Sequence, residues 1–333
     1  MRAAAPSRRN LLAGGLLALA APACGPLDAG LLRAAETHPP GYPTTAALEE
    51  FGRLLAERSD GRLRLQLYAG GQLGEEKDTL EITIFGGLDL NRVNLAPLNA
   101  FAPLTIPPTL PFLFRSIAHM RAAMDGAPGK QILASLEPHG LIGLCFYDSG
   151  ARSIYTTRRP VLRPADLAGQ KIRVMNSDVA VALVEALGAD AAPVPYGEVY
   201  QGLLQGLVDG AENNLPSFES SRHFEAARYY SLTQHTMAPE VLVASARTWR
   251  KLAPEQRALV RQCAADSVVL MRRLWDARTA AAEAKIRAAG VTVLTPDPAP
   301  FAARARGVWE RFLTTPASKQ LVADILAVEV RGV

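Results

Sequence analysis

A single helical pattern that runs from Pro254 to Ala289 is the feature that most constrains the fold of this chain. Pro254 suits a first helical turn, where its missing N–H costs nothing, and Gly290 follows the pattern as a stop. Apolar or small residues recur on one face of the pattern, at Leu259, Cys263, Ser267, Leu270, Met271, Leu274 and Trp275. A straight helix of this length would extend about 54 Å, which is more than the width of a small domain. We therefore expect a helix that bridges two lobes or kinks between them.

Strands and helices alternate before this long helix. Apolar alternation and periodicity predict strands at residues 31–36, 62–68, 88–95 and 141–147, with helices at 44–58, 74–85, 116–125 and 130–136. We expect Thr44 or Thr45 to cap the first helix, and the segment from Pro103 to Pro111 to be a rigid extended connector. The β–α–β order predicts a largely parallel sheet covered by helices. A second α/β unit is expected to begin after the break at residues 148–152.

Residues 1–23 have the pattern of an export signal. A basic start with Arg8 and Arg9 precedes an apolar stretch from Leu11 to Ala23, which is too short to cross a hydrocarbon core of about 30 Å. The paired arginines fit a twin-arginine signal, and an ordinary secretory signal fits equally well. Lipidation of Cys24 is the less favoured alternative, because a leucine usually stands three residues before a lipidated cysteine. We expect a periplasmic protein.

The charge balance gives no reason to expect a nucleic-acid partner. The net charge is +4, but Arg2, Arg8 and Arg9 lie in the expected signal, which contains no acid, so +1 remains from Cys24 onward. No basic stripe with interleaved aromatic residues is present in the sequence.

Sequence motifs of catalysis and metal binding are missing. The chain has no CxxC, HExxH, GxSxG or P-loop motif, so we expect no catalytic residue, no metal and no cofactor. Cys145 and Cys263 stand in apolar surroundings 118 residues apart, and we expect buried free thiols rather than a disulfide.

The run from Gln170 to Asn214 carries residues suited to a small organic acid. Arg173 lies on a short apolar strand, and a guanidinium is always charged and presents two parallel donors to a carboxylate. Tyr196 offers a flat apolar wall, and the amide of Asn213 both donates and accepts hydrogen bonds. These residue types predict a binding site for a carboxylate.

The same run resembles the substrate-binding proteins of tripartite ATP-independent periplasmic (TRAP) transporters, the DctP-like family. The matching motifs are GQKIRV and the pattern P-Y-x-E-V-Y-x-x-L-x-Q-G-x-V-D-G-x-E-N, together with SDGRLRLQLYAGGQLGEE, GLDLNRV and the late long helix. The resemblance covers essentially the whole chain after the signal. It implies an α/β fold of two lobes, each a mixed sheet flanked by helices, with the long helix spanning both.

Carried over residue by residue, the resemblance implies that Arg173 is the principal carboxylate-binding arginine. Arg152 matches a second arginine, Tyr196 an aromatic that packs on the ligand, and Asn213 a polar contact. A structural role is the alternative for each of them. Glu212 is an acid beside the expected anion, so we expect it to brace an arginine or to point away.

Two further candidates come from the first part of the chain. Asn94 falls at the ligand-facing end of a strand, and His38 lies in a proline-rich loop after the first strand, where such folds line their clefts. The stretch ETHPPGYPTT resembles a subgroup with sugar-acid ligands, so a hexuronate is the favoured ligand.

The resemblance also implies the division of the chain and its partners. We expect one lobe from residues 27–150 with 239–278, and the other from 151–238 with 279–333. The implied function is that of a monomeric receptor that delivers a small acid to the membrane subunits of an ion-gradient-driven transporter. The alternatives are a receptor of the same fold for a signalling partner and, less favoured, a periplasmic enzyme.

Overall fold

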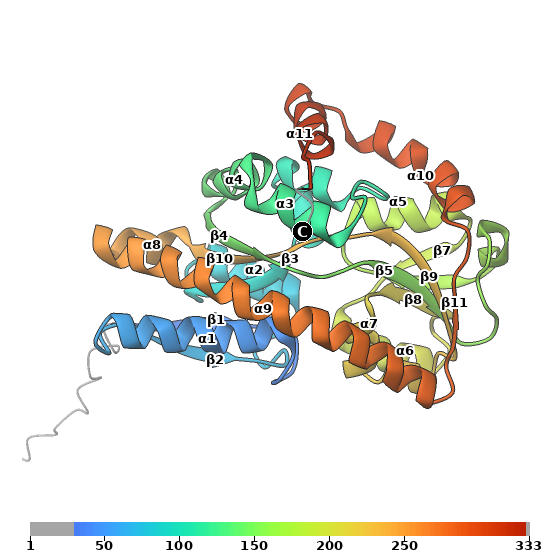
Figure 1. Ribbon diagram of the computed structural model, residues 1–333, viewed down its shortest axis with the longest axis horizontal. Coiled ribbons are helices and arrows are strands. Elements are labelled where there is room, and N and C mark those ends of the chain that lie inside the picture. Colours follow the sequence, from blue (N-terminus) through green and yellow to red (C-terminus); the bar gives the residue numbers. More distant parts are fainter. Residues whose placement is uncertain (1–29, 331–333) are drawn as a thin grey trace, which may run out of the picture.

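Two mixed sheets and one long helix organise the chain in the computed structural model, which describes residues 30–330 (Figure 1). The expected export signal at residues 1–23 and Cys24 lie outside the described residues. The long helix crosses the molecule along its longest axis and passes beside both sheets (Figure 1). The predicted α/β class and two-lobed architecture are confirmed.

The first sheet has the strand order β2-β1-β3-β10-β4. Its inner strand β1 pairs in parallel with β2 and β3, whereas β10 enters antiparallel between β3 and β4. The β–α–β order therefore produces the expected parallel part, and a strand from much later in the chain makes the sheet mixed. The strands are β1 (Leu31–Ala35), β2 (Arg64–Tyr68), β3 (Leu90–Asn94), β4 (Leu141–Tyr147) and β10 (Glu240–Ser245).

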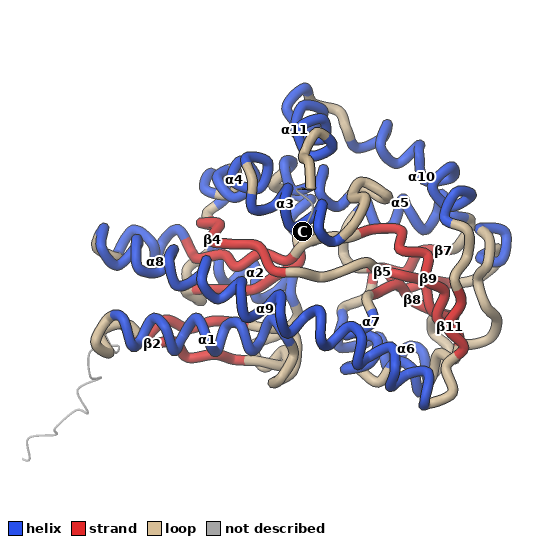
Figure 2. The backbone as a smooth tube through the Cα atoms, in the orientation of Figure 1, coloured by secondary structure: helices blue, strands red, loops and turns tan. Residues whose placement is uncertain are grey.

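Helices cover both faces of this sheet (Figure 2). Their apolar residues form two cores, one under α1 and α9 and one under α3 and α4. The helices of this part are α1 (Pro43–Arg58), α2 (Glu76–Ile84), α3 (Ile117–Asp125), α4 (Ala127–Ala134) and α8 (Ala246–Lys251).

The second sheet has the order β11-β9-β5-β8-β6-β7. Strand β8 lies between β5, to which it is antiparallel, and β6, to which it is parallel. The strands are β5 (Arg152–Thr156), β6 (Lys171–Val174), β7 (Asp190–Pro193), β8 (Gly210–Asn213), β9 (Tyr229–Thr236) and β11 (Thr292–Leu294), and the helices are α5 (Asp178–Leu187), α6 (Val199–Leu204) and α7 (Leu215–Ser220).

The long helix is α9 (Pro254–Ala288), one residue shorter than predicted. It packs on α1 and β4 in its first part and on α7 further along. Cys263, Ser267, Met271 and Trp275 are buried on the expected face, whereas the three leucines of the predicted face are only partly buried. Cys145 and Cys263 are buried free thiols, as predicted.

Two strand connections join the sheets, from β4 to β5 and from β9 to β10. In the first connection Asp148 is buried, and its Oδ2 accepts from Arg121 Nη2 of α3 at 2.5 Å. The same guanidinium contacts Asp276 of α9 at 2.6 Å. Charged groups thus tie the connection to both helices.

Two local predictions were wrong. The first helix starts at Pro43, because proline suits the first turn, and Tyr42 at the N-cap position makes no side-chain capping hydrogen bond. Thr44 instead donates its hydroxyl to Glu36 Oε2 at 3.0 Å. The segment from Pro103 to Pro111 is not extended. It forms two 3₁₀ turns, Pro103–Thr105 and Pro107–Thr109, each of which begins with a proline.

The C-terminal segment contacts both halves of the molecule. Helix α10 (Pro298–Phe312) packs on α5, and α11 (Pro316–Leu326) packs on α4 and on the two 3₁₀ turns at residues 103–109. The boundaries expected at residues 150/151, 238/239 and 278/279 stay a prediction, and α11 makes its contacts with elements of the other expected lobe.

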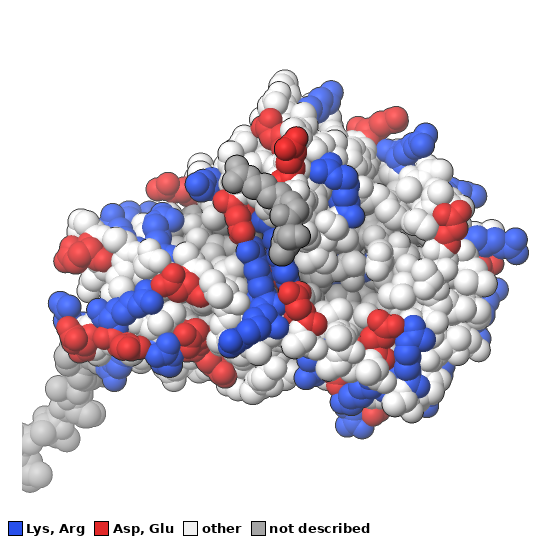
Figure 3. All heavy atoms as spheres, in the orientation of Figure 1, with Lys and Arg blue, Asp and Glu red and all other residues white. Residues whose placement is uncertain are grey.

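The surface carries charges of both signs. On the face drawn in Figure 3, acidic and basic side chains of the described residues are interspersed, with no extended area of one sign. None of the helices between residues 30 and 330 combines the length and the apolar character needed to cross a membrane.

Candidate functional site

The six candidate residues come together around one pocket between the two sheets. Its lining includes His38 and Asn94 from the first part of the chain, and Arg152, Arg173, Tyr196 and Asn213 from the second. Strand ends position them: His38 follows β1, Asn94 ends β3, and Asn213 ends β8. The ends of parallel strands meet at one edge of each sheet, and the two edges face each other across the pocket.

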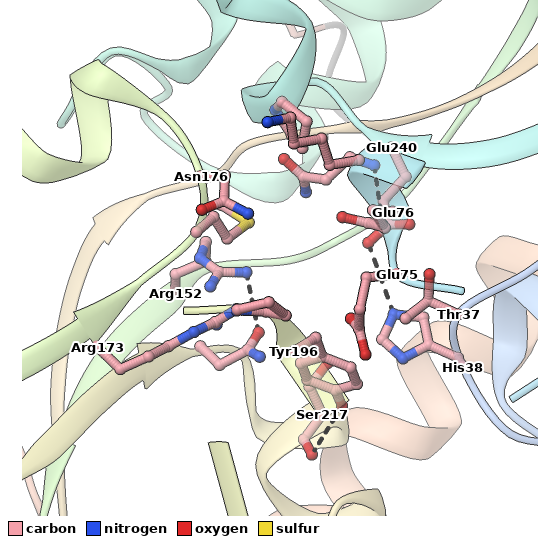
Figure 4. A pocket seen from close by; sticks show the side chains of 16 residues that line it. Thr37, His38, Glu75, Glu76, Arg152, Arg173, Asn176, Tyr196, Ser217 and Glu240 are labelled. Atoms are coloured by element: carbon pink, nitrogen blue, oxygen red, sulfur yellow. Dashed lines mark hydrogen bonds and ion pairs between the residues drawn. The ribbon is translucent and has the colours of Figure 1, made fainter. Parts of the chain in front are cut away.

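Arg173 is a buried cation without a carboxylate partner among the described residues. Its side chain lies on β6 with 3% of the residue exposed, and its Nε donates to Val194 O at 2.7 Å. Burial lowers the pKa of Arg173, and the charge of Arg152 acts in the same direction, although Tyr155 and Glu212 oppose the shift. The buried charge faces the pocket (Figure 4).

The other two buried arginines are neutralised within the protein. Of the buried arginines between residues 30 and 330, Arg92 and Arg152 form ion pairs and Arg173 forms none. Arg152 Nε lies 2.6 Å from Glu212 Oε2, and its Nη2 lies 2.8 Å from Glu212 Oε1. Glu212 therefore braces an arginine, which was one of the two outcomes expected for it.

Asn213 and Arg152 hold each other in place at the pocket. Asn213 Oδ1 accepts from Arg152 Nη1 at 2.9 Å and from the backbone N–H of Asn214, also at 2.9 Å. The Nδ2 of Asn213 donates to none of the described residues, so it is available to a bound molecule. Asn94 differs, because both atoms of its amide bond to backbone, at Ala238 O and Ala96 N.

The opposite wall of the pocket is acidic (Figure 4). Glu76 and Glu240 line it, and both bind the fully buried Arg92, which Glu36 also contacts. Although burial by itself raises the pKa of Glu240, Arg92 and then His38 bring it to about 2. Three carboxyl groups thus surround one guanidinium on this side, opposite Arg173, and burial raises the pKa of one of them, Glu76.

Aromatic rings close one end of the pocket. The ring of His38 stacks on Tyr42 with centroids 3.8 Å apart, and it meets the edge of Tyr196 at 5.3 Å. His38 Nε2 lies 3.9 Å from Glu240 Oε1, and its buried Nδ1 has no hydrogen-bond partner among the described residues. Tyr42 Oη lies 2.9 Å from Ser217 Oγ, so this end of the pocket joins the two lobes.

Sequence reasoning missed the acidic wall and part of the polar rim. The missed lining residues with polar side chains are Thr37, Glu75, Glu76, Lys77, Asn176, Ser217 and Glu240. A signal existed for the buried pair, because Arg92 lies in the middle of the strand sequence LNRVN and Glu240 directly precedes the apolar run VLVA. A charge in a buried strand requires a partner. The described residues hold no group of three or more His, Cys, Asp and Glu side chains suited to a metal ion.

This architecture has two lobes joined by crossing strands, around a pocket where the buried Arg173 has no ion pair with the residues that the structure describes. It defines a two-lobed binding protein for small anions. The family model for DctP, described as bacterial extracellular solute-binding protein, family 7, matches residues 34–315. The chain therefore belongs to this family of solute-binding proteins, and its membership confirms the resemblance seen in the sequence motifs.

Individual relatives agree with this assignment. A solute-binding protein of Chromohalobacter salexigens is 40% identical over 290 residues, which are 86% of this chain and 86% of the relative. A TRAP periplasmic solute-binding protein of a Bradyrhizobium species, crystallised with galacturonate, is 49% identical, with a TM-score of 0.87 over 89% of this chain and 99% of that one. A counterpart from Roseobacter denitrificans, with bound β-D-glucuronate, is 40% identical, with a TM-score of 0.88 over 90% and 100% of the two chains.

Proposed function

We propose that this protein is an extracytoplasmic receptor that binds a hexuronate and delivers it to the membrane subunits of a TRAP transporter. The proposal includes export to the periplasm, as the basic and apolar pattern of residues 1–23 suggests. We also propose that the receptor acts as a monomer, as the family resemblance implies.

One observation carries the proposal: Arg173 is buried beside the pocket and has no ion pair with the described residues. A buried charge without a counterion is costly, and the carboxylate of a ligand would remove that cost. The planar guanidinium matches the two oxygens of a carboxylate. Arg152 takes a secondary role, because Glu212 already neutralises it and the pair holds Asn213 beside the ligand carboxylate.

The acidic wall supports a sugar acid over a dicarboxylate. Glu76 and Glu240 accept hydrogen bonds, which suits the hydroxyl groups of a sugar and repels a second carboxylate. The relatives crystallised with galacturonate and glucuronate are similar to this chain over nearly their whole length. A ligand that contacts both walls favours the closed arrangement of the lobes, because only that arrangement satisfies both sets of contacts.

Calorimetric titration tests the proposal. D-Glucuronate and D-galacturonate are compared with D-glucose and D-galactose, which lack the carboxylate, and with succinate, which has two carboxylates and no hydroxyl. We expect one or both uronates to bind at least about 30-fold more tightly than the two neutral sugars, since a buried charge pair is worth about 2–5 kcal/mol. We expect succinate to bind more weakly than the uronates as well, because its second carboxylate would face Glu240 and it has no hydroxyl groups. Tighter binding of succinate than of either uronate would overturn the sugar-acid assignment.

A further inference from the structure

Glu75 reaches across the pocket from one lobe to the other. It occupies the N-cap position of α2, beside the first sheet, but its side chain makes no capping hydrogen bond there. Its carboxylate instead accepts from the backbone N–H of Gly197, which lies 3.2 Å from Oε1 and 3.4 Å from Oε2. Gly197 belongs to the 3₁₀ turn Tyr196–Glu198 beside the second sheet. The contact therefore exists only while the lobes are close together.

The receiving turn is shaped for this approach. A Cβ atom at Gly197 would lie 2.4 Å from Glu75 Oε1, so a side chain at this position would displace the carboxylate from its place against the backbone N–H. The first N–H groups of a helical turn have no acceptor within the turn, which leaves Gly197 N–H free to bond outward. Its neighbour Tyr196 lines the ligand pocket, whereas Gly197 does not.

From these contacts we propose that Glu75 is a positioning residue for ligand binding, which holds the two lobes closed through Gly197 and thereby keeps Tyr196 against the bound acid. Glu75 raises the affinity by stabilising the closed state that the ligand requires. This inference rests on the proposed binding of a hexuronate, and it adds a residue that acts through the other lobe rather than through the ligand carboxylate.

The sign of the effect separates this role from simple charge repulsion. A carboxylate near an anion site weakens binding of an anion, so loss of Glu75 would strengthen binding if its charge were all that mattered. Loss of a closing contact weakens binding instead. Glu75 also lines the pocket, and a direct contact with the ligand would weaken binding in the same direction when lost. Gly197 distinguishes these two roles, because it lies outside the pocket lining.

The experiment is a double-substitution cycle with Glu75→Ala, Gly197→Ala and the double variant, measured by calorimetry with D-glucuronate and D-galacturonate. A charge-assisted hydrogen bond at this half-exposed position corresponds to roughly a tenfold loss of affinity. We expect this loss for each single variant and no further loss in the double variant, since both substitutions remove the same contact. The factor should be the same for both uronates and should appear in the dissociation rate. Glu75→Gln should lie between Glu75→Ala and the wild type.

Glu198→Ala serves as the matched control. It removes an exposed acid from the same turn, outside the pocket lining, and we expect binding to stay within about twofold of the wild type because exposed charges are screened. Additive losses in the cycle, or a loss for Glu75→Ala that differs between the two uronates, would show direct contact with the ligand and overturn the inference. Unchanged or tighter binding by Glu75→Ala would overturn it as well.

Closure can also be measured without any ligand. Spin labels at Phe85 and Leu204, which are exposed on different lobes, report the closed fraction in a Cys24→Ser background, where the remaining cysteines are buried. Glu75→Ala and Gly197→Ala should each lower that fraction, and equal fractions in all proteins would overturn the closing role. If the wild-type protein binds neither uronate, the proposed function fails, and this measurement still decides the role of Glu75.

Discussion

Arg152 and Glu212 form a buried bidentate ion pair between the neighbouring strands β5 and β8, with Arg152 Nε 2.6 Å from Glu212 Oε2. Arg173, on the next strand β6, is buried to the same extent and has no ion pair with the described residues. The two arginines therefore have different electrostatic surroundings although both line the pocket. One charge is balanced inside the protein, and the other is available to a ligand.

Substitution of Arg173 should abolish most of the affinity for the acid. Arg173→Ala removes the unpaired charge, and Arg173→Lys cannot replace the planar pair of donors. We expect both variants to bind about 30- to 5,000-fold more weakly in calorimetry, which corresponds to about 2–5 kcal/mol. Arg158→Ala, at an exposed arginine outside the pocket, is the control and should bind as the wild type does. Equal affinities of all four proteins would contradict the assignment of Arg173.

Substitution of Glu212 should reduce stability more than substitution of an exposed acid, although both remove one negative charge. Glu212→Gln leaves the buried guanidinium of Arg152 without its counterion, which costs about 3–5 kcal/mol in the free energy of unfolding. Glu283→Gln breaks the exposed pair with Arg287 and should cost less than about 1 kcal/mol. Urea denaturation at neutral pH measures both values. Similar losses for the two variants would mean that Arg152 finds another partner.

His223 should make the protein less stable as the pH falls from about 6.5. Burial, and next the charge of Arg173, lower the pKa of His223 to about 3, and its Nδ1 lies 2.8 Å from Tyr155 Oη. Between about pH 6.5 and pH 3, His223 binds a proton in the unfolded chain but not in the folded protein. The stability contribution of neutral His223 is therefore fully present above about pH 6.5 and is lost on acidification toward pH 3. One proton changes the unfolding free energy by at most about 1.4 kcal/mol per pH unit.

Denaturation midpoints at pH 7, 6 and 5 test this pH dependence, since the acidic groups titrate mostly below that range. His223→Gln should flatten the fall in stability, whatever its effect at pH 7. His139→Gln, at a partly exposed histidine, should retain the slope of the wild type. A wild-type slope in the His223 variant would show that another group causes the acid sensitivity.

A side chain at Gly150 should destabilise the protein, because this glycine lies between the two lobes beside the long helix. Its φ is 58°, and an added Cβ would lie 3.0 Å from the ring of Trp275. Gly206 also has a positive φ, of 70°, but has nothing within 4 Å of such a Cβ. We expect Gly206→Ala to cost about 1–2 kcal/mol from the backbone alone, and Gly150→Ala to cost about 1–3 kcal/mol more from overpacking. Thermal denaturation that gives equal losses would leave Trp275 with no part in the effect.

Local signals were sufficient for the regular elements. The long helix begins at Pro254 as predicted and ends one residue early, since a proline at the first turn and a glycine after the last turn act on their immediate neighbours. The same reasoning was wrong where two local outcomes compete. Proline suits both an extended segment and a first helical turn, and the packing around Pro103 and Pro107 selected the turn.

Ion pairs between residues far apart in the chain were harder to predict from the sequence. Glu36, Glu76 and Glu240 surround Arg92, although they come from three separate parts of the chain. Side-chain chemistry pointed to Arg173, Tyr196 and Asn213, whereas the family resemblance added Arg152 and Asn94. The structure brings all six candidate residues to the pocket lining. Their role in binding stays a prediction until ligand affinities are measured.

The sequence by itself determined the long helix, the alternating strands and helices of the first part of the chain, the resemblance to a family of two-lobed solute receptors, and the position of Arg173 on a short strand. Only the tertiary structure decided that Glu212 neutralises Arg152, whereas Arg173 has no ion pair with any residue between positions 30 and 330. The physical reason is that helix and strand formation depend on neighbours along the chain, whereas the energy of a charge depends on distances through space. The order and register of the strands set those distances, and local sequence patterns predict neither of them.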